Sequence, residues 1–448
     1  MKPFDDIHMM IVSQYFTAIS DFITLEFVNK KYNGNMERFH FNPIPLNMNM
    51  IKYFQNIKTL NLWYEKDENF GNFIINDKKE INEYKKIDFY QINVWFEVTY
   101  DVTQLNKNSN FIFKKVTYSY NDREKYGDVI PTSIKKLGCS CFVKSLNNSI
   151  QIPNTVTSIG NNCFSECGNL TTITLPLYLK EIGECCFEFC NTLKTITLTQ
   201  HVYSFGENCF QFCTRLSFIC LPNTLNILPN ACFYNCHNLE SVTFPSQIKS
   251  IGDNCFAGCL SLSSVTIPNC EEYIGHSAFA SCKELNYVII NGNVKVIGNE
   301  CFKDCQLLTS ISLPSDVKEI GRSSFQACRS LKTIKFPQLI KSVQSHCFDG
   351  CYRLSFIELP LELSSIAECC FRNCFDLESL ILPTKVMEIG EAAFCNCGSL
   401  QTIIIPYKVI EIPLRCFYEC NSLEICIPNS ITLFGEKCFE GCKSVIRY

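Results

Sequence analysis

A Cys-Phe dipeptide recurs through most of this chain, with Ala-Phe or Ser-Phe in three places. The first and last intervals are 22 residues, and every other interval is 23. The phenylalanines of the series are Phe142, Phe164, Phe187, Phe210, Phe233, Phe256, Phe279, Phe302, Phe325, Phe348, Phe371, Phe394, Phe417 and Phe439. A fixed period of this length is the signature of a repeat protein, in which each unit packs only against its neighbours. The chain is therefore constrained to an array of about fourteen equivalent units over residues 129–448.

Each unit carries the pattern of a short strand followed by a turn. In residues 170–187, Ile173 and Leu175 alternate with threonines, which predicts a strand with one buried face. Pro176 follows, and proline ends a strand because it cannot donate a ladder hydrogen bond. One strand and one turn cannot bury a core alone, so we expect the units to stack into a parallel solenoid.

Two features of the turn predict its backbone. Glycines such as Gly183 recur shortly before the phenylalanine, and we expect them to need a positive φ. Cys186 and Cys190 stand at positions i and i+4 around Phe187. This spacing predicts that the two cysteines lie on one side of a single helical turn.

The whole pattern, Leu-x-x-Ile-x-Leu-Pro-x-x-Leu-x-x-Ile-Gly-x-x-Cys-Phe-x-x-Cys, resembles the BspA-like leucine-rich repeat family of bacterial surface antigens and anaerobic protozoa. The resemblance covers residues 129–448. It implies a repeat solenoid, a leucine-rich repeat horseshoe with a parallel β-sheet on the concave face and short helical turns and loops on the convex side. It also implies binding or adhesion, and no catalysis. Thr199 and Asn291 depart from the pattern, because each replaces the proline.

Residues 1–128 differ in composition, since they contain both tryptophans and none of the cysteines. This break predicts a domain boundary near residue 128. Apolar residues at helical spacing predict two short helices in residues 1–41, with Asp21 as the N-cap of the second. We interpret residues 1–41 as a small helical cap. We interpret residues 42–128 as a β-rich segment of irregular leading repeats that continues the same sheet.

The apolar residues of segment 5–32 are also similar in order to an F-box. Phe4-Asp5 stands where that motif has Leu-Pro. An F-box-like hairpin would make the chain an intracellular adaptor that presents a client to a ubiquitin ligase. The cap and the adaptor are compatible interpretations, and both stay open here.

The 31 cysteines all fall between Cys139 and Cys442, mostly in two columns of the repeat. The column before the phenylalanine also contains Ala278, Ser324 and Ala393, which favours a small, mostly apolar core residue. Disulfides are the alternative in an oxidising compartment. A metal site is disfavoured, because evenly spaced pairs do not converge into four ligands. The predicted structural ladder includes Cys163, Phe164, Cys167, Cys186, Phe187, Cys190, Cys301, Phe302 and Cys305.

The outward positions of the predicted strands are mostly serine and threonine, which suit a solvated sheet. Phe218, Tyr287 and Phe356 interrupt one outward column at intervals of 69 residues, or three units. Exposed aromatic residues in a polar groove are candidate anchors for a partner, while scattered apolar surface residues are the alternative. The candidate binding residues of the concave face are Phe218, Tyr287, Phe356, Lys335, Glu358, Ile381 and Ile404.

The sequence contains no recognisable catalytic constellation or phosphate-binding loop. We therefore expect no enzymatic activity, no cofactor and no metal, and a protein partner of unknown identity. The net charge of −4 provides no positive field for nucleic acid. No stretch reaches the ~18 apolar residues of a membrane span, and Asp5 and Asp6 stand where a signal peptide needs positive charge. We expect a cytoplasmic location, with an unconventional route to the cell surface as the alternative.

Overall fold

The computed structural model describes residues 6–76 and 86–447, and the chain divides after Gly138 into two compact units. The sequence predicts the boundary near residue 128. The structure keeps residues 129–138 with the first unit, because strand β4 (Lys136–Leu137) pairs in parallel with β3 (Phe111–Tyr118).

The first unit combines short helices with a parallel sheet. Its strands β1 (Thr59–Leu62), β2 (Gln91–Thr99), β3 and β4 are neighbours in that order. The described helices of this unit are α1 (Asp6–Ser13), α2 (Ile19–Val28), α3 (Tyr100–Leu105) and α4 (Tyr120–Tyr126), with 3-10 helices η1 (Lys30–Tyr32), η2 (Met36–Arg38) and η3 (Ile51–Tyr53). Helices α1 and α2 form where the sequence predicts a helical hairpin.

One aromatic core joins α2 to the segments that follow it. The ring of Phe22 on α2 is fully buried and lies edge-on to Phe39 and Phe54, with centroids 5.9 and 5.5 Å away. Asp21 is not the N-cap predicted from the sequence. Ala18 occupies that position, and the Asp21 carboxylate reaches back to accept a hydrogen bond from its N–H at 3.3 Å.

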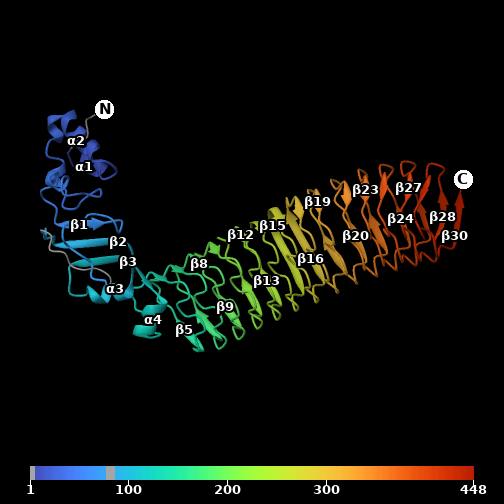
Figure 1. Ribbon diagram of the computed structural model, residues 1–448, viewed down its shortest axis with the longest axis horizontal. Coiled ribbons are helices and arrows are strands. Elements are labelled where there is room, and N and C mark those ends of the chain that lie inside the picture. Colours follow the sequence, from blue (N-terminus) through green and yellow to red (C-terminus); the bar gives the residue numbers. More distant parts are fainter. Residues whose placement is uncertain (1–5, 77–85, 448) are drawn as a thin grey trace. The chain divides into compact units, whose positions relative to one another are not determined.

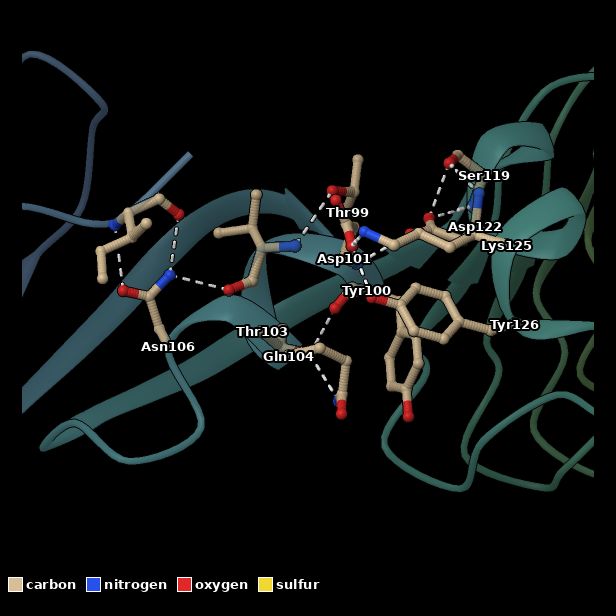
Figure 2. Close-up of polar contacts among 12 residues, drawn as sticks. Thr99, Tyr100, Asp101, Thr103, Gln104, Asn106, Ser119, Asp122, Lys125 and Tyr126 are labelled. Carbon is tan, nitrogen blue, oxygen red and sulfur yellow. Dashed lines mark hydrogen bonds and ion pairs between the residues drawn. The ribbon is translucent and has the colours of Figure 1, made fainter. Parts of the chain in front are cut away.

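A polar network fixes α3 against α4 (Figure 2). The buried carboxylate of Asp122 accepts hydrogen bonds from the Asp101 N–H at 2.7 Å and from the N–H and hydroxyl of Ser119. The Asp101 carboxylate accepts hydrogen bonds from the Lys125 ammonium at 2.6 Å and from the Tyr126 hydroxyl. These two donors hold the pKa of Asp101 below its usual value, and the carboxylate raises the pKa of Tyr126.

The second unit is a rod of stacked turns with one repeat per turn (Figure 1). We name each turn by its phenylalanine. The longer strand of each turn follows the second cysteine, and these strands are β5 (Ser149–Gln151), β7 (Thr172–Thr174), β9 (Thr195–Thr197), β11 (Phe218–Cys220), β13 (Ser241–Thr243), β15 (Ser264–Ile274), β16 (Tyr287–Gly292), β18 (Ser310–Ser312), β20 (Thr333–Lys335), β22 (Phe356–Glu358), β24 (Ser379–Ile381), β26 (Thr402–Ile404), β28 (Glu424–Ile427) and β30 (Ser444–Arg447).

A second strand, here called the shorter strand, precedes most of the Cys-Phe pairs; β14 is the exception in length, with four residues where β13 has three. The shorter strands are β6 (Ser158–Ile159), β8 (Glu181–Ile182), β10 (Ser204–Phe205), β12 (Ile227–Leu228), β14 (Ile248–Ile251), β17 (Val296–Ile297), β19 (Glu319–Ile320), β21 (Ser342–Val343), β23 (Ser365–Ile366), β25 (Glu388–Ile389), β27 (Glu411–Ile412) and β29 (Leu433–Phe434). Strands of successive turns pair in parallel, so that Ile173 lies opposite Ile196. This is the parallel solenoid that the repeat predicts. Where Asn291 replaces the proline, β16 runs on to Gly292.

The Cys-Phe-x-x-Cys segment is not the helical turn predicted from its spacing. The backbone N–H groups of Cys185, Phe187 and Phe189 donate to carbonyls of the next turn at 2.8–2.9 Å, and so do not build a helix within their own turn. Cys185 and Phe189 adopt positive φ values of 50° and 57° to make this possible. The ladder phenylalanines stack above one another in the core, with Phe302 centred 5.6 Å from Phe279.

The recurring glycines allow close packing between turns, and the prediction that they need a positive φ is wrong. Neither Gly183 nor Gly298 has a φ between +20° and +160°. A Cβ added at Gly298 would lie 2.6 Å from both the Gly275 carbonyl carbon and the His276 nitrogen. Glycine fits at Gly298 because the backbone of the preceding turn occupies the space of a side chain, whereas turns with Gln344 or Ala367 at this position must leave room for one.

Candidate functional site

The outward side of the longer strands β5 to β30, here called the strand face, carries the residues predicted to bind a partner. The rings of Phe218 and Tyr287 are 46% exposed and that of Phe356 is 56% exposed. They belong to β11, β16 and β22, whose central residues are buried and whose flanking residues face solvent. Since paired strands lie about 4.8 Å apart, three turns separate successive rings by roughly 15 Å.

Four of the seven predicted residues line one hollow of about 490 Å³ on the strand face. Lys335 and Glu358 lie opposite each other in the β20–β22 register, with the ammonium 3.5 Å from the carboxylate. Phe356 and Ile381 form apolar walls, and Ile381 is 82% exposed. Ile404 on β26 lies directly beside Ile381 in register and extends the apolar surface.

Phe218 and Tyr287 do not line this hollow. They lie six and three turns before Phe356, on the same face of the solenoid. Five of the seven predicted residues therefore lie in or beside this hollow, and Phe218 and Tyr287 lie apart from it.

Sequence reasoning missed the loop side of the hollow, which Leu361, Gln338 and Pro383 line. Leu361 follows Pro360 and is exposed, whereas Ser315 and Gln338 occupy the same repeat position in preceding turns. An exposed apolar residue at a position that is polar in most turns was the signal that could have identified it, although Leu177 and Tyr407 occupy the same position elsewhere.

The hollow is suited to non-covalent recognition. Its apolar walls can bury a side chain of a partner, and burial of apolar surface is the main favourable contribution to such contacts. The Lys335–Glu358 pair is solvent-exposed, so it stabilises little by itself. It places one positive and one negative group at the edge of the hollow, which can orient a polar neighbour of the buried side chain.

The second cysteine column has a role in the backbone that its spacing does not reveal. In thirteen turns its thiol donates a hydrogen bond of 3.0–3.3 Å to the carbonyl of the preceding ladder phenylalanine. The first column admits Ala278 and Ala393, which have no such donor. In that column Ser324 instead donates to the carbonyls of Gly298 and Gly321 at 3.0 and 2.6 Å.

The columns are poorly suited to nucleophilic chemistry. All 31 cysteines lie within the described residues and are thiols. Burial raises the pKa of Cys282 to about 12 and raises the pKa of Cys186 and Cys301 well above the usual value. A thiol is a nucleophile and a metal ligand as its thiolate, so these groups are largely unreactive near neutral pH.

Residues 6–76 and 86–447 contain neither a metal-ligand cluster nor a helix that could span a membrane. Within these ranges the His, Cys, Asp and Glu side chains form no group of three or more that could hold a metal ion. No helix in the same part of the chain combines the length and the apolar character needed to cross a membrane.

Comparison with known proteins identifies the repeat. The model of the BspA type leucine-rich repeat region matches residues 132–260, 204–332 and 318–446. A leucine-rich repeat protein from Bacteroides ovatus has a similar structure, with a TM-score of 0.53 and 27% identity over 69% of this chain and 80% of that chain. A leucine rich cell surface protein from Faecalibacterium prausnitzii has a TM-score of 0.42 and 24% identity over 68% of this chain and 83% of that chain.

No curated protein gives a significant sequence match. The three overlapping family matches nevertheless span the repeat array from residue 132 to residue 446, well over half of the sequence. The chain therefore belongs to the BspA type leucine-rich repeat family.

Proposed function

We propose that this protein is a non-enzymatic scaffold that binds a protein partner on its strand face. The observation that carries the proposal is the hollow between Phe356 and Ile381, beside the exposed Ile404. Most other turns present serine or threonine at these outward positions. Clustered apolar side chains on an otherwise polar surface are typical of interaction sites.

The solenoid supports this role because it presents its anchors on a stack of paired strands. Phe218, Tyr287 and Phe356 project from one outward column, so an elongated partner can contact all three over about 30 Å. Binding energy in such contacts is concentrated in a few large side chains surrounded by nearly neutral positions.

The test compares partner capture by the full chain with capture by variants of the strand face. Phe356→Ala combined with Ile381→Thr removes the apolar walls and restores the hydroxyl residue that other turns carry. Ile227→Thr is the matched control, because Ile227 is exposed on the shorter strand β12. We expect the double variant to lose about 1 kcal/mol or more of binding free energy, with unchanged thermal melting. Equal capture of the partner by all three proteins would exclude the hollow as the binding site.

We also propose that the protein acts in the cytoplasm, with adhesion at a cell surface as the alternative. The interchange of cysteine with Ala278, Ser324 and Ala393 in the first column supports a reducing compartment, because the position calls for a small core residue and not for a disulfide partner. Localisation of a tagged chain tests this directly: surface labelling of intact cells would favour adhesion or the binding of an external ligand.

A second candidate function is that of an intracellular adaptor for a ubiquitin ligase. It is favoured by the exposed apolar residues of the α1–α2 hairpin, where Ile7, Ile11 and Tyr15 follow a four-residue spacing and Phe27 is 86% exposed. Ile7→Asp with Ile11→Asp should abolish co-purification of a ligase subunit without unfolding the chain. Retention of strand-face binding by this variant would separate the two functions.

A further inference from the structure

We infer that the solenoid recognises an acidic segment of its protein partner through a basic notch at the edge of the strand face, next to Phe218; this inference rests on the proposed function. The notch is a hollow of about 360 Å³ lined by Lys194, Arg215, Ser217 and Asn238. These residues come from three successive turns, so the notch exists only in the stacked solenoid. Ser217 directly precedes Phe218, which places the basic group next to an exposed aromatic anchor.

The two cations of the notch are available to a ligand. Lys194 and Arg215 are exposed, and neither forms an ion pair with any residue that the structure describes. Some exposed lysines of the solenoid are paired, such as Lys385 with Glu362 and Lys295 with Asp316, whereas Lys318 and Lys341 are exposed without a paired carboxylate among the described residues and line none of the hollows described here. The lining of the notch includes no carboxylate.

The donors of the notch favour a carboxylate. The backbone N–H groups of Ser217 and Asn238 already donate to carbonyls of the preceding turn at 3.1 and 3.2 Å. The Ser217 hydroxyl also donates to the Lys194 carbonyl, at 3.4 Å. The side chains of Lys194, Arg215 and Asn238 are therefore the donors that we expect to contact a ligand. The planar guanidinium of Arg215 matches a carboxylate in a two-point contact, while the ammonium of Lys194 adds a second positive charge.

The rest of the chain gives no general attraction for an acidic peptide, because its net charge is −4. An acidic segment that binds must therefore be held by a local group of positive charges, such as the notch. The apolar hollow at Phe356 lies six turns further along the solenoid, roughly 30 Å away. Together the two sites would fix the direction in which a partner lies along the solenoid, with acidic residues toward Phe218 and apolar residues toward Ile381.

The experiment measures binding of a fluorescein-labelled hexaglutamate peptide to the full chain by fluorescence anisotropy. Lys194→Gln with Arg215→Gln should weaken the affinity about tenfold, the loss expected for two exposed charge pairs. The matched control is Lys318→Gln with Lys341→Gln, since both lysines are exposed, lie one turn apart and line none of the hollows described here. We expect this control to bind like the unchanged chain, and both variants to keep its melting temperature.

Three outcomes would overturn the inference. An equal loss in the control would show that net charge alone attracts the peptide, and no measurable binding to the unchanged chain would exclude the site. Stronger competition by inorganic phosphate than by glutamate would assign the notch to phosphate instead of carboxylate. None of these results depends on Phe356 or Ile381, so a failure here leaves the apolar hollow to be judged by its own variants.

Discussion

The thiol of Cys305 donates a hydrogen bond to the main-chain carbonyl of Phe279, 3.2 Å away in the preceding turn. The same bond recurs along the second cysteine column, so this column links the turns through the backbone as well as through packing. Cys301, in the first column, occupies the position that alanine fills in the Phe279 turn. The two columns therefore differ in what a substitution removes.

The first prediction compares these columns in one turn. Cys305→Ala and Cys301→Ala remove the same thiol group from fully buried sites. Cys305→Ala also removes the donor to Phe279, so it should destabilise its turn by about 1 kcal/mol more than Cys301→Ala does. Hydrogen exchange of the backbone from the Phe279 turn to the Phe325 turn measures the difference. Equal protection in both variants would show that the thiol bond contributes nothing.

The second prediction concerns the aromatic ladder. Phe302 is fully buried between Phe279 and Phe325, with ring centroids 5.6 and 5.7 Å away. Phe302→Ala leaves a cavity and should cost about 3–5 kcal/mol, whereas the exposed Phe356→Ala should cost less than about 0.5 kcal/mol. Because each turn contacts only its neighbours, hydrogen exchange should rise near residue 302 alone. A uniform rise through the solenoid would contradict this.

The third prediction separates packing from conformational freedom at glycine. Gly298→Ala places a Cβ 2.6 Å from backbone atoms of the preceding turn, and Gly398→Ala places one in open space. The first change should destabilise its turn by about 1–3 kcal/mol through overpacking, and the second should be nearly neutral. Thermal melting and local hydrogen exchange of the two variants provide the comparison. A neutral Gly298→Ala would show that the turns can separate without cost.

The repeat predicts the buried side of the solenoid well, because burial and strand alternation are properties of a single unit. Leu175, Cys186 and Phe187 are buried, as their positions in the unit predict. The proline rule holds only in part: β7 ends at Thr174, two residues before Pro176, but β9 ends at Thr197 without a proline and β15 runs through Pro268. Such rules need no knowledge of the neighbouring turn.

The turn backbone could not be predicted in this way. Positive φ values occur at Cys185, Asn208 and Ala231, which share no side-chain property in the sequence. A positive φ costs roughly 1–2 kcal/mol for a residue with a side chain, and hydrogen bonds to the next turn offset that cost. The hollow at Ile381 depends similarly on residues 23 and 46 positions apart in the sequence. Both features come from stacking, which a local pattern does not contain.

The fourth prediction uses pH to test the network between α3 and α4. The hydrogen bond from Lys125 lowers the pKa of Asp101 below its ordinary value of 3.8. A lowered carboxyl pKa stabilises the folded state above the ordinary value, and this contribution is lost as the pH falls through the folded pKa. Hydrogen exchange of α3 and α4 should therefore increase as the pH falls from neutrality to about 2, after correction for intrinsic rates. Asp101→Asn should show weaker protection at neutral pH and a smaller change in acid; an identical pH response would exclude Asp101 as its source.

The last prediction concerns the thiols. Cys139, Cys220 and Cys426 are exposed, whereas most other cysteines are buried in the two columns. Burial raises the pKa of Cys282 to about 12 and that of Cys270 to about 11, so these groups stay protonated at neutral pH and inaccessible to an alkylating reagent. In the native protein, iodoacetamide should therefore label the three exposed thiols first.

Unfolding in denaturant without a reductant should release nearly all of the 31 thiols for labelling. Protein alkylated inside intact cells and analysed by mass spectrometry reports the native state. Ten or more cysteines found in disulfides would contradict the prediction and place the chain in an oxidising compartment.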